Sequence, residues 1–372
     1  MKKAVMYGAG NIGRGFIGQL MSQSGYEVVF IDVNTQVVDK LNNDMCYPIM
    51  FASDEGNYEV IIENVRAVNG LDIEGVAKEI SEADVMATAV GVKVLPRIAG
   101  PLAKGLSKRW ENKNIKPLNI IICENLIDAN HYLKKIVKDE LDDRGKVYVD
   151  ELVGFVEASI GRMVPVATSE MQKGNILRVC VEEYGELPVD KEGFKGEIPL
   201  INNMIPFSPF EYFIQRKLFI HNMGHAITAY LGYLKGYKYI WEAIRDSDIF
   251  NICRIAMMES AKALSLEHGV ELIKIEEHVD DLLRRFANKQ LGDTVERVGR
   301  DLQRKLSAND RLIGAFNLCI KKGIIPRGIG IGITAAVQFE DNVKGEMHLI
   351  NEESIYKEIM ERALRIFIKS KR

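Results

Sequence analysis

Residues 3–32 read KAVMYGAGNIGRGFIGQLMSQSGYEVVFID. Two apolar runs, at 3–7 and 27–31, have the composition of buried β-strands, and the residues from about 11 to 24 between them predict a helix. Gly8, Gly10 and Gly13 form a GxGxxG pattern where the first strand meets this helix. In that setting the first glycine permits a tight turn, the second lets the backbone approach a pyrophosphate, and the third lets the helix pack on the strand. The stretch therefore predicts a site for a dinucleotide, with its diphosphate on the free N–H groups at the helix start.

Asp32 ends the second predicted strand, 19 residues beyond Gly13, close to the spacing of the acid that binds a ribose hydroxyl. Its carboxylate would repel a 2′-phosphate, and the next residues, Val33, Asn34 and Thr35, supply no cation. We therefore expect NAD rather than NADP. A glycine turn that binds no ligand is the alternative interpretation. The predicted cofactor site consists of Tyr7, Gly8, Ala9, Gly10, Asn11, Ile12, Gly13 and Asp32.

Further strands are predicted at 85–89 and 118–123, with helices near 92–109 and 127–140. Apolar strands that alternate with helices are typical of a parallel sheet covered on both faces, so we expect an α/β fold with a Rossmann-type doubly wound sheet. Four of the ten prolines fall between 186 and 210, which indicates a linker or a crossover. The rest of the chain has helical patterns, including charged amphipathic stretches at 254–288 and 352–370. We expect a nucleotide-binding domain over 1–195 and a mostly α-helical catalytic domain over 205–372.

The composition excludes several classes of protein. The 372 residues are 47% apolar and 27% charged, as in globular proteins, and the net charge of −3 gives no basic field for nucleic acid or an anionic membrane. The five cysteines are scattered, which favours free thiols in a reducing compartment. No apolar run approaches a membrane span or a secretory signal. These features predict a soluble, cytoplasmic protein of two domains.

The segment RKLFIHNMGHAITAYLG, residues 216–232, contains Lys217, Asn222 and His225. At 100° per residue of an α-helix, Asn222 and His225 lie about 140° and 80° around from Lys217, so all three share one face. A desolvated lysine suits a general base, an amide can donate to a developing alkoxide, and an imidazole can orient a hydroxyl. A solvated helix face is the alternative interpretation.

A second polar segment, residues 296–311, carries Arg297, Arg300, Arg304, Lys305 and Arg311. If the segment is helical, its arginines form one cationic stripe that suits a phosphate monoester, although a solvated basic face would have the same pattern. His221 and His225 have the spacing of a zinc pair, but no HExxH motif or thiolate cluster accompanies them, so we expect no metal and assign His221 to helix packing. The glycine-rich run 326–334 lacks a strand–turn–helix setting and predicts tight packing instead.

The pattern Lys217-x4-Asn222-x2-His225 resembles the signature of the polyol-specific long-chain dehydrogenases, a metal-independent family with a Rossmann domain and a helical domain. GAGNIGRGFIG at 8–18, CENL at 123–126 and RKLSANDR at 304–311 extend the resemblance over nearly the whole chain. It implies NAD-dependent interconversion of mannitol 1-phosphate and fructose 6-phosphate, or else oxidation of an unphosphorylated polyol or a hexuronate. A nucleotide-responsive regulatory protein is the rival from another class.

The resemblance also implies roles for individual residues. Lys217 is the general acid/base, Asn125 and Asn222 stabilise the oxyanion, and His225 contacts the substrate. Arg297 and Lys305 match positions that bind the polyol, which leaves Arg300 and Arg304 for the phosphate. The sequence departs from relatives at Gly161, where they usually carry an aspartate before the arginine of a DRIVP-like motif, and at Lys289 and Leu302, where proline is expected.

Overall fold

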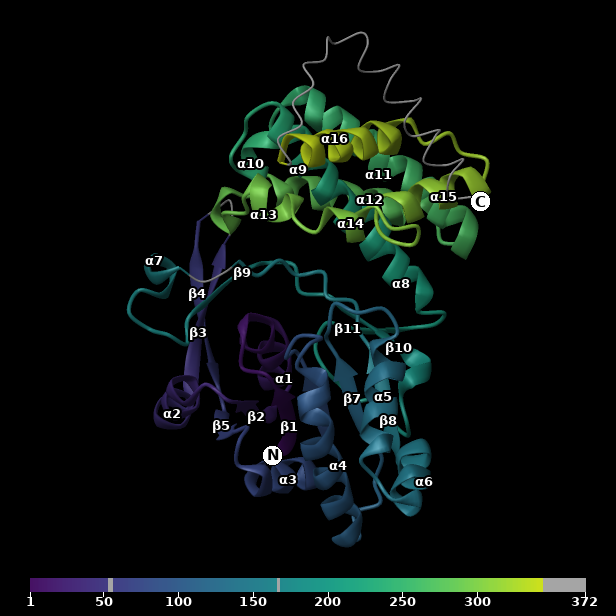
Figure 1. Cartoon of the computed structure of the whole chain (residues 1–372). Helices are drawn as coiled ribbons and strands as arrows, with labels where there is room; N and C mark the ends of the chain where they lie inside the picture. The colour runs from purple at the N-terminus through teal and green to yellow at the C-terminus, as the bar shows by residue number, and fades with distance from the viewer. Residues whose placement is uncertain (53–55, 166–167, 344–372) are drawn as a thin grey trace. The chain divides into compact units, whose positions relative to one another are not determined.

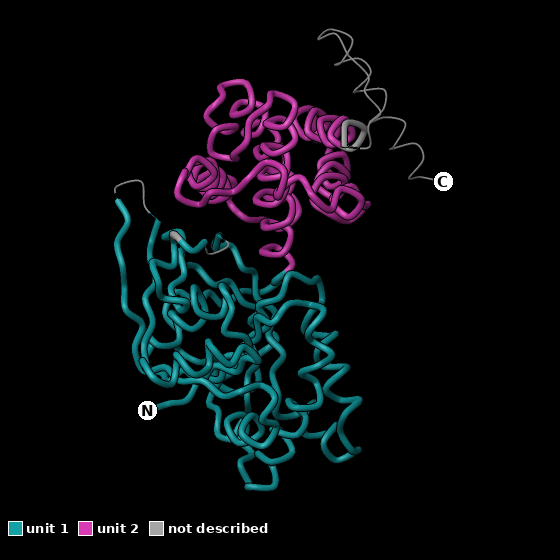
Figure 2. The backbone as a smooth tube through the Cα atoms, turned by 60° about the vertical axis from the view of Figure 1, so that its left-hand side comes forward, with its two compact units in different colours: residues 1–210 teal, residues 211–372 magenta. Residues whose placement is uncertain are grey.

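The computed structural model describes residues 1–52, 56–165 and 168–343 (Figure 1). The predicted amphipathic stretch at 352–370 lies outside the described residues. The chain divides into two compact units, residues 1–210 and 211–372 (Figure 2).

The first unit is built on a six-stranded parallel sheet (Figure 1). Its order is β5-β2-β1-β6-β7-β8, the strand order of two mononucleotide-binding halves that meet between β1 and β6. The predicted doubly wound fold class is therefore confirmed. The strands are β1 (Lys2–Tyr7), β2 (Tyr26–Asp32), β5 (Val65–Asn69), β6 (Val85–Thr88), β7 (Leu118–Ile122) and β8 (Val153–Glu157).

Alternation along each strand divides the core into two layers. In β1, Val5 and Tyr7 pack with one apolar cluster, while Ala4 and Met6 pack with the other. The first cluster includes side chains from α3 (Ile73–Glu82), α4 (Leu95–Glu111), α5 (Ala129–Asp139) and α6 (Asp143–Leu152). The second includes side chains from η1 (Gly13–Gly18), α1 (Gln19–Gln23) and α2 (Thr35–Asp44). Because both faces are covered, the central residues of β1, β2, β6 and β7 are mostly apolar.

A second, three-stranded sheet in this unit was not predicted. It has the order β4-β3-β9, from β3 (Cys46–Ala52), β4 (Tyr58–Glu63) and β9 (Val179–Glu182). Tyr47 and Ile49 of β3 are completely buried in the second apolar cluster. The short helix α7 (Ser169–Gln172) precedes β9.

The proline-rich segment is a crossover packed on the first unit. It contains β10 (Leu187–Asp190), η2 (Lys191–Gly193) and β11 (Met204–Phe207), with β10 and β11 paired in parallel. The Asn119 side chain of β7 holds the connection by two hydrogen bonds, donating to the Lys195 carbonyl at 3.1 Å and accepting from its amide at 2.8 Å.

The second unit is helical throughout its described part. The predicted stretch 254–288 is two helices, because Gly269 adopts a positive φ of 68° between them. No helix in the described ranges is long and apolar enough to cross a membrane. The elements are α8 (Glu211–Arg216), η3 (Lys217–Asn222), α9 (Met223–Leu234), α10 (Ile240–Ala243), α11 (Ser247–His268), α12 (Leu272–Phe286), η4 (Lys289–Leu291), α13 (Val295–Gly299), α14 (Leu302–Lys305), α15 (Ile313–Lys321) and α16 (Arg327–Val343).

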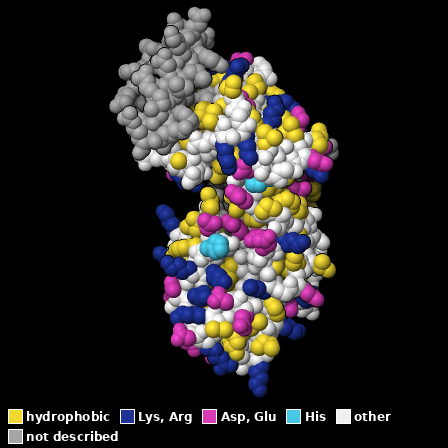
Figure 3. Space-filling model, turned by 90° about the vertical axis from the view of Figure 1, so that its right-hand side faces the viewer, with side chains coloured by type: hydrophobic (Ala, Val, Ile, Leu, Met, Phe, Trp, Pro, Cys, Tyr) yellow, Lys and Arg dark blue, Asp and Glu magenta, His cyan; other side chains and the backbone are white. Residues whose placement is uncertain are grey.

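The glycine-rich run at the start of α16 is a packing device, as predicted. A Cβ on Gly328 would lie 2.7 Å from the backbone nitrogen of Ala256, and one on Gly332 would lie 2.4 Å from the Ile227 side chain. On the face drawn in Figure 3, basic and acidic side chains are intermingled, which agrees with the small net charge.

Candidate active site

The glycine turn leaves an open backbone at one position only. Gly8 has a φ of 104°, and a Cβ there would lie 2.6 Å from the Ala89 carbonyl oxygen. A Cβ on Gly13 would lie 1.9 Å from the Gly8 oxygen, which only a glycine avoids. A Cβ on Gly10 would meet nothing within 4 Å. The turn is therefore packed at its two ends and open at Gly10, where a pyrophosphate would approach.

Asp32 lies at the carboxyl end of β2, and its carboxylate is tied to this turn. Oδ2 accepts a hydrogen bond from the Ala9 amide at 2.7 Å, and Oδ1 accepts one from the Asn34 amide at 2.9 Å. The side chain is half-buried. An ionised carboxylate has about four acceptor positions, so these two bonds leave capacity for a ribose hydroxyl.

Asn125 lies at the same edge of the sheet. It follows β7 by three residues, in the loop before α5, and it is exposed. Ligands bind at this edge in open α/β sheets, outside the carboxyl ends of the strands.

In the second unit, Lys217 and Asn222 are the first and last residues of a π-helical turn. The prediction of a regular α-helix at this point was wrong. A π-turn is closed by i→i+5 hydrogen bonds, so residues five apart lie above one another on the same side of the helix. This geometry brings Lys217 and Asn222 closer in angle than the α-helical 140°. Both side chains are half-buried, and His225 follows three residues later in α9.

His225 packs between a carboxylate and an aromatic ring. Its Nε2 lies 3.4 Å from Oδ2 of Asp293, and its ring stacks on Phe286 with the centroids 5.0 Å apart. Burial lowers the pKa of His225 to about 4, although Asp293 acts in the opposite direction. The imidazole is therefore uncharged at neutral pH, with one nitrogen as donor and the other as acceptor.

His221 is buried next to Phe286, and burial lowers its pKa well below the usual value. These contacts agree with a helix-packing residue. Among the described residues, no group of three or more His, Cys, Asp or Glu side chains could hold a metal ion.

The predicted cationic stripe is broken. Helix α13 ends at Gly299, Arg300 has an extended backbone with ψ at 167°, and Asp301 is left-handed before α14 begins. The condition for one cationic stripe, a single helix over 296–311, is therefore not met, and the arginines do not follow a single helical face. Arg300 pairs with Glu296 at 2.9 Å, and Arg304 lies 3.7 Å from Asp301.

Two other cations of this segment, Lys305 and Arg311, are buried. Lys305 is only 5% exposed, and its Nζ donates to the carbonyl oxygens of Val298 and Arg300. Burial, reinforced by the charges of Arg311 and Arg304, lowers the pKa of Lys305 to about 8. The Asp293 carboxylate that faces His225 also pairs with Arg297. The second unit thus connects His225 to the cationic segment through Asp293.

Comparison with known proteins identifies the family. Residues 2–203 match the Mannitol dehydrogenase Rossmann domain, and residues 210–365 match the Mannitol dehydrogenase C-terminal domain. The chain belongs to the mannitol dehydrogenase family. It is an oxidoreductase with a Rossmann-type nucleotide-binding domain.

Three relatives named mannitol-1-phosphate 5-dehydrogenase share 39–40% identity with this member of the family. The protein of Brevibacillus brevis is 40% identical over 91% of the chain and 86% of its own length. That of Clostridium acetobutylicum is 40% identical over 96% of the chain and 93% of its own length, and that of Thermoanaerobacter pseudethanolicus is 39% identical over 91% and 86%.

Two solved structures of polyol dehydrogenases share the fold. A D-sorbitol dehydrogenase in substrate-free form matches with a TM-score of 0.76 at 16% identity, over 90% of the chain and 80% of the other. Pseudomonas fluorescens mannitol 2-dehydrogenase, in a ternary complex with NAD and D-mannitol, matches with a TM-score of 0.72 at 13% identity, over 91% and 79%.

The departures from the dehydrogenase pattern have local explanations. A Cβ on Gly161 would lie 2.9 Å from the Tyr184 ring, so the tyrosine takes the space that a side chain would need. The neighbouring Arg162 is buried and donates to the Gly15 carbonyl at 3.0 Å and the Gln19 side chain at 2.6 Å. Lys289 and Leu302 are each the first residue of a short helix, the position that tolerates proline without requiring it.

Three groups beside the dehydrogenase motifs were not predicted from the sequence. Asp293 and Phe286 reach His225 from other segments, which no local pattern reveals. Arg14, directly after the glycine turn, is buried and interacts electrostatically with Asp32. The signal for Arg14 was a cation inside an otherwise apolar helix.

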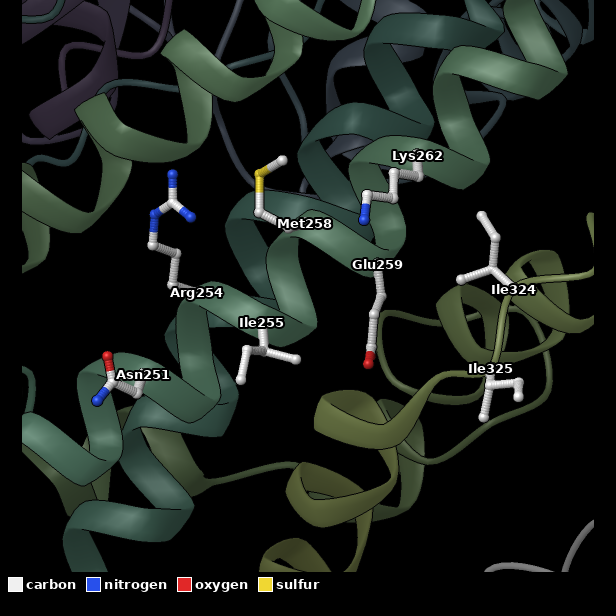
Figure 4. A pocket seen from close by; sticks show the side chains of 8 residues that line it. All are labelled: Asn251, Arg254, Ile255, Met258, Glu259, Lys262, Ile324 and Ile325. Carbon is white, nitrogen blue, oxygen red and sulfur yellow. The ribbon is translucent and has the colours of Figure 1, made fainter.

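A pocket of about 620 Å³ lies in the second unit, between α11 and the segment before α16 (Figure 4). None of the predicted site residues lines it. Its lining is Asn251, Arg254, Ile255, Met258, Glu259, Lys262, Ile324 and Ile325.

Proposed function

We propose that the chain is an NAD-dependent mannitol-1-phosphate 5-dehydrogenase that interconverts D-mannitol 1-phosphate and D-fructose 6-phosphate. The observation that carries this proposal is 39–40% identity, over at least 91% of the chain, to three relatives with that name. We assign nucleotide binding to residues 1–195 and substrate binding and catalysis to residues 205–372.

The first unit fits NAD. The open backbone at Gly10 receives the diphosphate, the rest of the turn from Tyr7 to Gly13 surrounds it, and Asp32 binds a ribose hydroxyl. When bound, NAD accepts a hydride from the carbon that bears the reacting hydroxyl. The carboxylate of Asp32 favours NAD because it would repel the additional phosphate of NADP.

We assign three side chains to the reacting oxygen. In the oxidation direction, Lys217 takes the proton of the 5-hydroxyl, while the amides of Asn125 and Asn222 donate to the oxygen as negative charge develops. His225 contacts a substrate hydroxyl as a neutral imidazole, held by Asp293 and Phe286. In the reverse direction, Lys217 returns the proton.

We assign the remaining cations to the sugar phosphate. Arg297 and Lys305 bind the polyol chain, and Arg300 and Arg304 bind the phosphate. The acidic partners of these two arginines do not prevent this role, because exposed ion pairs contribute little and a phosphate dianion competes well for the guanidinium.

An unphosphorylated polyol or a hexuronate is the alternative substrate. The observation in its favour is the broken cationic segment, in which Arg300 and Arg304 each already have a carboxylate partner. The same catalytic groups would serve either substrate.

Oxidation of NADH with fructose 6-phosphate, fructose and a hexuronate, measured in parallel, tests the proposal. We expect fructose 6-phosphate to have the highest kcat/KM by a wide margin. A preference for fructose or the hexuronate would establish the alternative, and inactivity with all three would favour a regulatory protein.

A further inference from the structure

The loop that carries Asn125 begins at a buried glutamate. Glu124 is 7% exposed, and its two carboxylate oxygens accept hydrogen bonds from the backbone amides of Val90 and Gly91, both at 2.9 Å. These amides belong to the loop after β6. Glu124 therefore joins the loops that follow two neighbouring strands, directly beside Asn125.

The loop after β6 in turn rests on the glycine turn. The Ala89 amide donates to the Tyr7 carbonyl at 2.9 Å, and the Ala89 oxygen is the atom that a Cβ on Gly8 would strike. The contacts thus run without a gap from the glycine turn through Ala89–Gly91 and Glu124 to Asn125. They set the position of Asn125 relative to the nucleotide site.

A second buried glutamate holds the other end of the same loop. Glu157, the last residue of β8, is 8% exposed, and its carboxyl group interacts with the backbone amides of Asp128 and Ala129, where α5 begins. Burial, together with the charges of Asp128 and Asp190, raises the pKa of Glu157 to about 7. The residues from 124 to 129 thus meet a buried carboxyl group at each end, with the exposed Asn125 between them.

We propose that Glu124 and Glu157 are positioning residues for the oxyanion-binding amide of Asn125. The inference rests on the proposed function, in which Asn125 donates to the reacting oxygen. Neither glutamate touches the substrate in this role; each acts by fixing the backbone that presents Asn125. A displacement of about 1 Å in such a group is enough to lower a rate by about a hundredfold.

The second unit supplies a matched control. Glu259 in α11 accepts hydrogen bonds from the amides of Gly328 and Ile329, at 3.0 and 3.1 Å, and so holds the start of α16 in the same way (Figure 4). It is not among the residues assigned to cofactor or substrate. Replacing Glu259 removes the same kind of double hydrogen bond without affecting the Asn125 loop.

The test compares Glu124→Gln, Glu157→Gln and Glu259→Gln, each alone and combined with Asn125→Ala. A glutamine offers one oxygen acceptor and turns its NH₂ group toward the second amide. We expect Glu124→Gln and Glu157→Gln to lower kcat by about ten- to a hundredfold at saturating NADH and fructose 6-phosphate, and Glu259→Gln to leave it unchanged. In the Asn125→Ala background, Glu124→Gln and Glu157→Gln should lower kcat by less than about twofold, because the effects of residues that act as a unit are not additive.

Wild-type kcat in both variants would overturn the inference, as would equal losses with and without Asn125. Wild-type kcat in Asn125→Ala alone would also overturn it, because no amide would then need positioning. Failure of the proposed function is distinguishable, since the wild type itself would not use fructose 6-phosphate. Far-UV circular dichroism verifies folding, and if Glu124→Gln does not fold, Glu157→Gln decides the question alone.

Discussion

Nε2 of His225 lies 3.4 Å from Oδ2 of Asp293, and the same carboxylate pairs with Arg297 through its other oxygen. A carboxylate beside an imidazole usually favours the charged ring. Here burial and the positive charges of Arg297, Lys305 and Arg311 outweigh Asp293, and the pKa of His225 falls to about 4. Asp293 therefore holds a neutral imidazole in place, with hydrogen-bonding capacity left for a substrate hydroxyl.

This pKa makes stability depend on pH in a defined window. Between about pH 6.5 and 4 the unfolded chain protonates His225 while the folded chain does not, so the free energy of unfolding falls as the pH falls through that window. From pH 7 to pH 5 the loss due to His225 should be about 2 kcal/mol. Urea unfolding of the wild type and of His225→Gln at both pH values measures it.

The difference between the two proteins isolates His225, because the other buried histidines titrate in both. We expect the variant to lose about 2 kcal/mol less than the wild type between pH 7 and pH 5. Equal losses in the two proteins would show that His225 titrates normally in the folded state.

The glycines of the turn should separate stability from cofactor binding. In Gly13→Ala the new Cβ meets the Gly8 oxygen at 1.9 Å, so we expect a loss of stability of about 3 kcal/mol. In Gly10→Ala the new Cβ meets nothing, so the fold should be retained while NADH binds about tenfold more weakly or worse, because the methyl group occupies the approach of the diphosphate. Urea unfolding and titration of NADH fluorescence check both. Loss of stability in Gly10→Ala with unchanged NADH affinity would contradict the assignment.

The nucleotide-binding half of the fold was readable from the sequence because its signals are local. Apolar runs of β1, β2, β6 and β7 are buried on both faces, and the glycine pattern lies within a single strand–turn–helix unit, where Gly13 closely approaches the Gly8 oxygen. The hairpin of β3 and β4 was missed because its identity depends on pairing with β9, more than a hundred residues away.

The candidate site in the helical unit was less accessible to sequence reasoning. A fixed angle per residue cannot anticipate the π-turn at Lys217–Asn222 or the left-handed Asp301, which breaks the cationic stripe. Asp293 was missed because it lies between η4 and α13, whereas its partner His225 is in α9, far away in the sequence. The residue types were informative there, whereas their geometry depended on tertiary contacts.

Asp32 should determine the choice of cofactor. We expect NAD to be preferred over NADP, and Asp32→Ala to lower kcat/KM for NAD by about ten- to a hundredfold, because a charged hydrogen bond to the ribose is lost. The kcat/KM for NADP should not fall in parallel, since the substitution also removes the carboxylate that repels the 2′-phosphate. Asp72→Ala removes a capping carboxylate from α3 and serves as the control that leaves the cofactor ratio unchanged. A wild type that uses both cofactors equally would refute the role of Asp32.

Lys217→Ala should abolish most of the turnover without affecting NADH binding. General acid–base catalysis contributes about 10²–10⁴ to the rate, and the glycine turn belongs to the other unit. Lys235→Ala, which removes an exposed lysine paired with Asp246, is the control with normal turnover. A chelator should have no effect on the wild type. Turnover of Lys217→Ala within a few-fold of the wild type would exclude the lysine from the mechanism.

The phosphate contacts of Arg300 and Arg304 can be tested by the selectivity between phosphorylated and plain sugar. Charged hydrogen bonds contribute about 1.5–3 kcal/mol each, whereas exposed ion pairs such as Arg300–Glu296 contribute about 1 kcal/mol or less. A phosphate should therefore displace the carboxylate partners. We expect Arg300→Ala or Arg304→Ala to raise KM for fructose 6-phosphate by about tenfold or more while kcat/KM for fructose stays the same.

Two further variants distinguish phosphate binding from a general effect of lost charge. Arg284→Ala removes an arginine that pairs with Asp281 on α12 and should change neither substrate. Arg297→Ala should weaken the binding of both sugars equally, because the proposed contact of Arg297 is with the polyol chain that they share. If Arg300→Ala and Arg304→Ala both keep the wild-type selectivity, these arginines form a solvated surface. The buried cations Lys305 and Arg311 would then be the next candidates for the phosphate, since their charges lie within the same segment.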